Sequence, residues 1–240
     1  MNAETGRRRY DSLRRAAQAR ETRAEIARAA RELFVSRGWA ETTVRDVARE
    51  AGVSVPTVYG AYGDKAGLVR ALADAADLAA DVPRMLAELE DAAQGTAAGP
   101  ASDGPRRQLA AMAAYDRRLF ERAGDVILLL REAGRTEPAL AAGYREGRRQ
   151  ADETRTQVFS SWPDGSDGSD GSDRADRADR ADRAGGVLRQ GLDVASAVDV
   201  YAAMCNIDVY TTLTEERGWP PERVERWWAD ALGRELLSRG

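Results

Sequence analysis

Residues 42–59 of the chain read TTVRDVAREAGVSVPTVY. The stretch begins with Thr42 and Thr43, a residue type that caps helix N-termini, and apolar residues then recur at helical spacing up to Gly52. Glycine commonly ends a helix, and Ser54 is of a type that caps the next one. The stretch therefore predicts two short helices joined by a tight turn.

Helices are also predicted on both sides of this pair. From Glu21 onward, apolar residues recur at helical spacing as far as Gly38, and Trp39 is expected to fold back on that helix. A further helix is expected to begin at Asp64. Two short helices joined by a glycine turn form a helix-turn-helix, whose second helix is used to enter the major groove of DNA.

The surrounding sequence makes this indication more specific. Residues 42–59 and the positions that follow closely resemble the DNA-binding domain of the tetracycline-repressor (TetR) family of bacterial transcription regulators. The matching positions beyond the stretch are Tyr62, Lys65 and Leu68. The resemblance covers residues 20–72. It implies an all-α chain, in which a three-helix DNA-binding domain precedes a larger helical bundle for effector binding and dimerisation.

The resemblance also implies roles for single residues. In regulators of this family, the residues that match Tyr59 and Lys65 grip DNA phosphates, and the start of the second helix faces base edges. Lys65 is the only lysine of the chain, and a lysine ammonium is a compact point charge suited to a phosphate. The chain departs from the usual family pattern at Gly60, Ala61 and Ala66.

Base recognition is expected to use mostly short side chains. Residues 54–57 lack the long polar groups that make bidentate contacts to guanine. Val55 and Pro56 are expected either to touch thymine methyl groups or to pack locally, and Arg45 is expected to supply any guanine contact. The predicted DNA-binding residues are Thr43, Arg45, Ser54, Val55, Pro56, Thr57, Tyr59 and Lys65.

The charge distribution agrees with a nucleic-acid partner at one end of the chain. Residues 1–70 carry 14 basic residues against 9 acidic ones, and residues 71–240 carry 22 against 31, so the net charges are +5 and −9. Residues 1–19 are a basic arm, which either follows a narrow minor groove or is a frayed, solvated tail. Its arginines are Arg7, Arg8, Arg9, Arg14 and Arg15.

Composition excludes several classes of enzyme. Histidine is absent and Cys205 is the only cysteine, so no intrachain disulfide, histidine-containing zinc site or histidine general base can form. We expect no catalytic residue, metal or cofactor. No apolar run is long enough to span a membrane and no secretory signal peptide is expected, which favours a cytoplasmic protein.

The remainder, residues 73–240, is predicted to be a helical domain, because no apolar/polar alternation or hairpin turn indicates a strand. Within it, residues 163–186 repeat Asp-Gly-Ser and then Asp-Arg-Ala, which predicts a disordered insertion. Its evenly spaced aspartates lack the alternation of an EF-hand calcium loop, and a solvated linker is therefore the favoured interpretation.

The helical domain is expected to hold an effector pocket and a dimer interface. The pocket candidates, which the sequence does not separate from ordinary core residues, are Met112, Tyr115, Phe120, Tyr144 and Phe159. Two adjacent apolar helices near the C-terminus resemble the four-helix dimer interface of the family, although the same stripe could face only its own domain. The interface candidates are Val198, Tyr201, Val209, Val224, Trp227, Trp228 and Ala231.

The sequence thus predicts a transcriptional regulator, most simply a repressor, that binds a palindromic DNA operator as a homodimer. A small, largely apolar organic effector is expected to release it from the operator. A helical protein–protein adaptor and a helical-bundle enzyme are the other hypotheses. An adaptor would not need the Tyr59 and Lys65 pair, and residues 106–240 contain no polar set at catalytic spacing.

Overall fold

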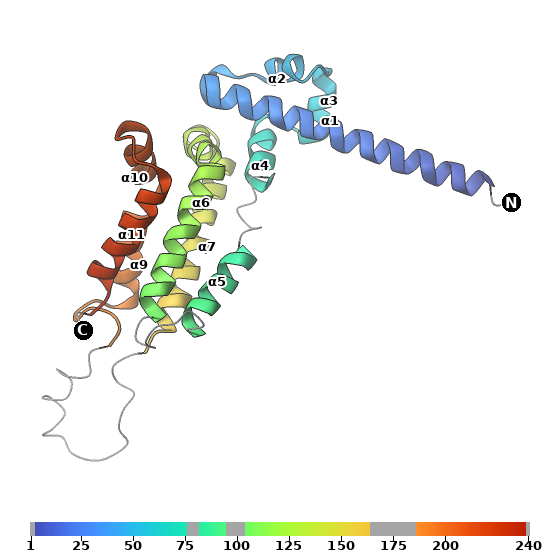
Figure 1. Cartoon of the computed structure of the whole chain (residues 1–240). Coiled ribbons are helices and arrows are strands. Elements are labelled where there is room, and N and C mark those ends of the chain that lie inside the picture. Colours follow the sequence, from blue (N-terminus) through green and yellow to red (C-terminus); the bar gives the residue numbers. More distant parts are fainter. Residues whose placement is uncertain (1–2, 76–81, 95–103, 164–185, 239–240) are drawn as a thin grey trace, which may run out of the picture. The chain divides into compact units, whose positions relative to one another are not determined.

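The computed structural model describes residues 3–75, 82–94, 104–163 and 186–238. In these ranges the regular elements are helices, and the extended pairing is an isolated antiparallel bridge between Leu188 and Leu237. The prediction of an all-α chain is therefore confirmed (Figure 1). The predicted disordered insertion lies, apart from its two end residues, outside the described residues.

The chain divides into two compact units. The first comprises Met1–Ala76 together with Asp125–Tyr144, and the second comprises Asp77–Gly124 together with Arg145–Gly240. Two long helices, α6 (Gly104–Ala133) and α7 (Pro138–Ser160), therefore each contribute one end to the first unit and the remainder to the second.

Four helices build the N-terminal part of the first unit. They are α1 (Ala3–Glu41), α2 (Val44–Glu50), α3 (Val55–Tyr62) and α4 (Lys65–Ala75). Near the end of α1, Gly38 adopts a φ of +83°, a conformation that glycine reaches without steric cost. The chain turns there, and Trp39 stacks on Phe34 with ring centroids 5.7 Å apart. The predicted return of Trp39 onto its own helix is confirmed.

The predicted basic arm has a regular backbone. Residues 3–19 form the first part of α1 and run without interruption into its packed part. Because the packed part already provides a helical nucleus, each further residue adds a backbone hydrogen bond at little extra cost. Residues 3–19 thus continue the packed part of α1 toward the N-terminus.

An apolar face of α1 forms the core of these four helices. Its buried residues lie three and four positions apart, which places them on one side of the helix. They are Ile26, Ala29, Ala30, Leu33 and Phe34. The other three helices contribute Val47, Val58, Leu68, Val69 and Leu72. At Gly67, a Cβ would lie only 1.9 Å from the carbonyl oxygen of Tyr62, so glycine allows α4 to approach the end of α3.

Polar contacts join α1 to the end of α6 and to the turn that follows it, within the first unit. The guanidinium of Arg31 donates two hydrogen bonds, of 2.7 and 2.8 Å, to the carboxylate of Asp125. The backbone N–H of Trp39 donates to Glu132 at 3.3 Å, and its indole N–H donates to the hydroxyl of Thr136 at 3.2 Å. We refer to these five residues as the clasp. The clasp holds residues 125–136 on α1.

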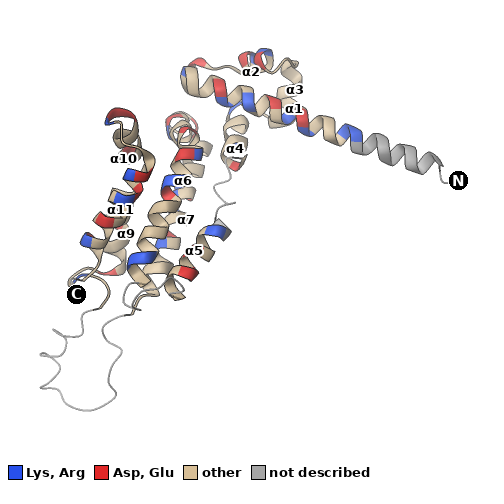
Figure 2. Cartoon of the chain, viewed as in Figure 1, with Lys and Arg blue, Asp and Glu red and all other residues tan. Residues whose placement is uncertain are grey.

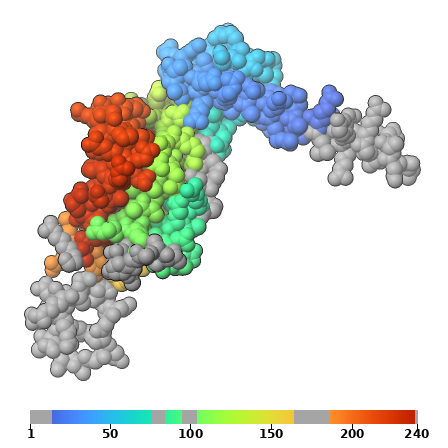
Figure 3. Space-filling model, in the orientation of Figure 1, coloured from blue at the N-terminus to red at the C-terminus, as the bar shows by residue number. Residues whose placement is uncertain are grey.

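The second unit is a helical bundle. Its elements, besides its parts of α6 and α7, are α5 (Val82–Gln94), α9 (Val194–Met204), α10 (Ile207–Thr211), the π-helix η2 (Thr212–Glu216) and α11 (Pro221–Leu236). Figure 3 shows α11 running along α6, and Arg117 on α6 donates to Glu225 on α11 at 2.5 Å. Among the described residues, no helix combines the length and apolar character that crossing a membrane requires.

Trp228 on α11 organises one side of this bundle. Its side chain is fully buried. Its indole N–H donates at 3.0 Å to the carbonyl oxygen of Met204, the last residue of α9. Its ring lies 6.1 Å from that of Phe120 and 6.2 Å from that of Tyr210. The tryptophan thus satisfies a carbonyl at a helix end and fixes α6, α10 and α11 around one aromatic cluster.

Candidate nucleic-acid interface

The start of α2 is fixed by a reciprocal cap. The hydroxyl oxygen of Thr43 accepts from the backbone N–H of Asp46 at 3.1 Å, and the Asp46 carboxylate accepts from the backbone N–H of Thr43, also at 3.1 Å. Hydrogen bonds that the hydroxyl and then the backbone N–H of Thr43 donate to the Asp46 carboxylate hold the pKa of Asp46 below its usual value. Thr43, a predicted DNA-binding residue, is exposed and already serves as the cap.

The start of α3 is capped in a similar way. The Ser54 hydroxyl oxygen accepts from the backbone N–H of Thr57 at 3.3 Å, and the two hydroxyl groups lie 2.7 Å apart. Pro56 occupies the first turn, where its missing N–H leaves no intrahelical acceptor unpaired. The turn that the sequence predicts is therefore present, with Ser54, Pro56 and Thr57 exposed and Val55 half-buried.

One residue of α3 anchors the helix and the next is presented outward. Val58 is buried against the domain core, whereas the Tyr59 side chain is 50% exposed. Tyr62, one turn further on, donates its hydroxyl proton to the carbonyl oxygen of Arg23 on α1 at 2.7 Å, and burial raises its pKa. The recognition helix is thus held at both ends, and Tyr59 is available to a partner.

Two arginines of α2 differ in their availability. Arg49 donates to the Asp46 carboxylate at 2.6 Å, which keeps it on its own helix. Arg45 is exposed, and within the described part of the chain its guanidinium has no hydrogen-bonding or ionic partner. A free guanidinium near the start of α2 is suited to a guanine edge or a phosphate.

Lys65 occupies an internal position that the sequence did not predict. Its ammonium donates to the carbonyl oxygen of Trp39 and lies 4.0 Å from the centre of that residue's ring. Burial lowers the pKa of Lys65, although glutamates nearby oppose this shift. An ammonium has three donors, so the bond to Trp39 leaves two for another acceptor. The lysine at the start of α4 therefore ties that helix to the clasp.

Figure 2 shows where charged residues lie along the helices of the first unit. Basic residues occur on the coloured part of α1, from residue 14 onward, and on α2, and acidic residues lie among them. The start of α3 carries no charge, in agreement with the uncharged residues 54–57. The surface around α2 and α3 therefore combines the short uncharged segment 54–57 with basic residues on either side of it.

The predicted effector residues do not gather at a single place. Met112 and Phe159 are buried in the second unit, and Tyr115 and Phe120 are half-buried there. Phe120 packs in the Trp228 cluster, whereas Phe159 packs 4.7 Å from Trp162 and 6.2 Å from Tyr201. Tyr144 belongs to the first unit. Phe120 and Phe159 thus have different aromatic neighbours, and an effector site at these residues stays a prediction.

A polar cluster that sequence reasoning missed lies within the second unit. Asp116 is fully buried, and its carboxylate accepts from the Tyr201 hydroxyl at 2.9 Å and lies 3.7 Å from Arg155. The Arg155 guanidinium lies 4.7 Å from the centre of the Tyr201 ring and donates to Asp152 at 2.7 Å. Burial raises the pKa values of Asp116 and Tyr201. The signal available in the sequence was an aspartate midway between Met112 and Phe120, four positions from each, on the apolar face of one helix.

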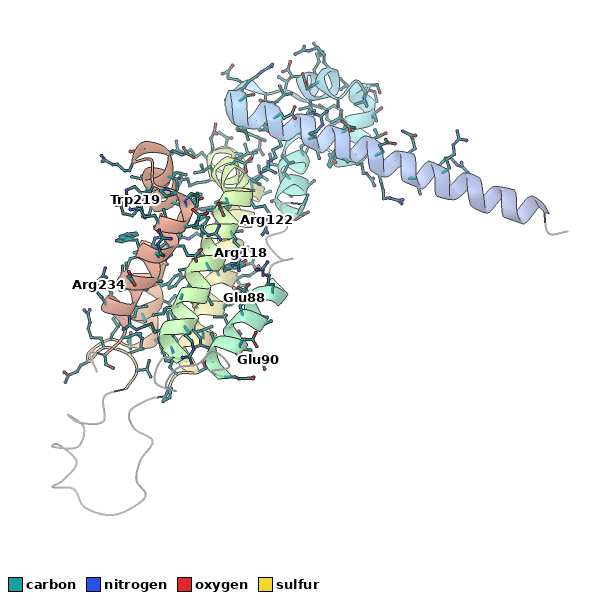
Figure 4. All side chains as sticks on the ribbon, in the orientation of Figure 1. Glu88, Glu90, Arg118, Arg122, Trp219 and Arg234 are labelled. Carbon is teal, nitrogen blue, oxygen red and sulfur yellow. The ribbon has the colours of Figure 1, made fainter. Side chains whose placement is uncertain are left out.

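A second buried polar contact accompanies it. The side-chain amide of Gln108 is buried, and its oxygen accepts from the indole N–H of Trp162 at 2.6 Å. Polar groups of this kind are costly to bury unless they are paired, so they fix the relative positions of α6, α7 and α9. Figure 4 labels a further pair at the edge of the same unit, Arg118 on α6 with Glu88 on α5, whose side chains lie 2.7 Å apart.

The predicted dimer residues fall into two groups. Five are buried within their own unit, at 7% exposure or less, and therefore cannot supply an outer surface: Val198, Tyr201, Val224, Trp228 and Ala231. Their assignment is corrected here to the core of the bundle. Val209 and Trp227 are half-buried and face outward in part. Trp227 packs edge-on against Trp219 at 6.2 Å, and Arg223 stacks over Trp219 at 3.8 Å.

Comparison with known proteins agrees with this arrangement. Residues 26–72 match the model of the family described as bacterial regulatory proteins, tetR family. The HTH-type transcriptional regulator TtgR of Pseudomonas putida is 42% identical over 74 residues, which are 31% of this chain and 35% of the relative. The chain thus matches about a third of the length of that curated relative.

Solved structures extend the likeness to the whole fold. A protein of Saccharomonospora viridis assigned as a transcriptional regulator and solved in complex with choline has a TM-score of 0.62 at 20% identity, over 91% of this chain and 99% of that one. NalD of Pseudomonas aeruginosa, the secondary repressor of the MexAB-OprM multidrug efflux pump, has a TM-score of 0.58 at 19% identity, over 91% and 98%.

The matched region coincides with the packed part of α1 and with α2, α3 and most of α4, which carry the caps, the exposed Tyr59 and the free Arg45. Local sequence, local geometry and the helical architecture of the remainder thus agree. The helix-turn-helix part of the chain, residues 26–72, is therefore similar to the tetR family of bacterial regulatory proteins, and the remainder shares the helical fold of solved regulators.

Proposed function

We propose that the protein is a cytoplasmic transcriptional repressor that binds a palindromic DNA operator as a homodimer and leaves it when a small organic effector binds. The observation that carries this proposal is the exposed edge of the helix-turn-helix. There the capped start of α3, the free guanidinium of Arg45 and the exposed Tyr59 project from one rigid domain. An adaptor has no need of such an edge.

At the operator, α3 enters the major groove with its N-terminal residues at the base edges. Val55 and Pro56 contact thymine methyl groups there, and Arg45 makes the bidentate contact to guanine. Tyr59 donates to a phosphate, and Lys65 offers its two remaining donors to another. Thr43, Ser54 and Thr57 use their hydroxyl groups as caps and contribute the backbone surface beside the groove.

The dimer is proposed to use the partly exposed apolar residues of the C-terminal helices. Val209 on α10, Trp227 on α11 and the adjoining Trp219 supply that surface, while the buried residues of α11 support it from within. A palindromic operator requires two copies of the recognition helix about 34–36 Å apart, one helical turn of DNA, which a symmetric dimer provides.

The effector is proposed to bind within the second unit, next to Met112, Tyr115 and Phe159. These apolar and aromatic residues favour a largely apolar organic molecule, and the nearby Asp116 and Arg155 supply polar groups for its orientation. A regulator of the same fold that was solved with choline supports a small organic ligand in this class of bundle. Release follows if the effector binds the conformer with mismatched recognition helices more tightly.

Arg45 provides the test of DNA recognition. We expect Arg45→Ala to weaken operator binding by about 1–3 kcal/mol and to relax the preference at one G·C position, because a bidentate contact is lost. Arg49→Ala on the same helix is the matched control, since Asp46 already holds that side chain. Selection of bound duplexes from a random pool, followed by titration, measures both effects. An unmutated protein that enriches no sequence would contradict the proposal.

Trp227 provides the test of the dimer. Trp227→Glu should convert the protein to a monomer and abolish operator binding, because a charge without a partner would be buried in an apolar interface. Leu86→Glu is the control, because Leu86 is an exposed apolar residue on α5, away from the C-terminal helices in sequence. Sedimentation velocity measures the oligomeric state, and a dimeric Trp227→Glu protein would remove this helix from the interface.

Phe159 provides the test of the effector site. Compounds that raise the melting temperature should also release operator DNA, and Phe159→Ala should reduce both effects by creating a cavity beside the ligand. Tyr144→Ala is the control, because Tyr144 belongs to the first unit. Thermal unfolding and DNA titration measure the two effects. If every stabilising compound left DNA affinity unchanged, the protein would be a constitutive DNA binder.

A further inference from the structure

We propose that the first part of α1, residues 3–24, is a second DNA-contacting element that binds phosphates of the duplex beside each operator half-site. This segment precedes residues 26–72, which match the family model, so its role is not part of that match. The inference rests on the proposed function, because it requires that α3 occupies a major groove. We refer to residues 3–24 as the N-terminal extension.

The N-terminal extension has no apolar face to bury. The buried face of α1 begins at Ile26, and from residue 14 to residue 25 every side chain is exposed except that of Thr22, which is half-buried. Tyr10 and Leu13 are the only large apolar residues of residues 3–24. A helix without an apolar stripe is suited neither to a helical bundle nor to a membrane surface. Its partner is therefore expected to be polar.

The charge of the N-terminal extension points to a polyanion. Residues 3–24 carry seven arginines against three acidic residues, a net charge of +4. The arginines with described side chains that have no hydrogen-bonding or ionic partner among the described residues are Arg14, Arg20 and Arg23, and each is exposed. Arginine is well suited to phosphate, because its guanidinium can donate two parallel hydrogen bonds to the oxygens.

The C-terminal end of the N-terminal extension lies beside α3, the proposed recognition helix. The Tyr62 hydroxyl at the end of α3 donates to the carbonyl oxygen of Arg23 at 2.7 Å, which fixes the position of α1 at that point. Tyr59, the proposed phosphate contact, lies one turn earlier on α3 and is exposed. Figure 1 shows α1 continuing past α2 and α3 toward its N-terminus. A duplex held by α3 therefore lies next to the C-terminal end of the N-terminal extension, near Arg23.

The helical backbone decides which part of the duplex can be reached. A helix with its side chains is about 10–12 Å across, whereas the minor groove is about 6 Å wide, so the helix cannot follow that groove. It can lie along the phosphates at the groove edge. At about 1.5 Å per residue, residues 3–24 span about 33 Å, close to one turn of B-form DNA. The proposed contact is thus to the sugar-phosphate backbone of the DNA, and it does not depend on the base sequence.

The test combines three substitutions with two duplexes. In Arg14→Gln/Arg20→Gln/Arg23→Gln, glutamine retains helix propensity and removes the charge. One duplex is trimmed to the selected operator, and the other carries about ten further base pairs on each side, one turn of DNA. On the longer duplex we expect affinity to fall, and the slope of log K against log salt to become shallower by about 0.9 for each lost contact. On the trimmed duplex, variant and unmutated protein should agree.

Two further variants make the result decisive. Arg14→Lys/Arg20→Lys/Arg23→Lys should retain the salt dependence, because a lysine ammonium also neutralises a phosphate. Arg145→Gln/Arg148→Gln/Arg226→Gln removes three exposed arginines outside the first unit and should change nothing. Equal slopes for the glutamine variant and the unmutated protein on the longer duplex would overturn the inference, as would loss of salt dependence in the lysine variant.

Failure of this inference can be told from failure of the proposed function. If only the N-terminal extension is wrongly assigned, the unmutated protein still selects an operator and binds the trimmed and longer duplexes alike. If the proposed function is wrong, the unmutated protein selects no sequence on either duplex. Circular dichroism of the glutamine variant, expected to match the unmutated protein, excludes unfolding of the helix as the cause of lost affinity.

Discussion

The clasp, which joins α1 to the end of α6 and the turn after it, is the contact on which the first unit depends. Arg31 and Asp125 form a two-pronged ion pair, but both are partly exposed, so the pair itself contributes about 1 kcal/mol or less. Trp39 adds one hydrogen bond from its backbone N–H and one from its buried indole ring, and Lys65 brings the start of α4 to its carbonyl. Residues 125–144 thereby become part of the DNA-binding unit.

The second unit uses a different means of fixing its helices. Its apolar core is divided between aromatic clusters around Trp228 and Phe159, and the buried Asp116 pairs with Tyr201 and Arg155 at the edge of the second cluster. Buried pairs of this kind add little stability relative to apolar residues, but they penalise every arrangement that separates them. The polar cluster therefore favours one arrangement of the helices that meet at it.

Local signals accounted for most of what the sequence predicted correctly. The Thr43 and Ser54 caps and the Gly38 turn depend on neighbouring residues, so the boundaries of the helix-turn-helix followed from their chemistry. Contacts between distant residues did not follow. Arg31 and Asp125 lie 94 positions apart, and the sequence shows only two ordinary surface charges. For the same reason, apolar spacing on α9 and α11 predicted buried residues without showing that most face their own unit.

Native-state hydrogen exchange tests the central claim, that the clasp makes residues 26–72 and 125–144 one cooperative unit. The account predicts that amides of residues 138–144 open with the same free energy as those of the helix-turn-helix, and that adding operator DNA raises the protection of both segments together. The remainder of α7, residues 145–160, should open separately. Uniform exchange along α7, with no response of residues 125–144 to DNA, would contradict the account.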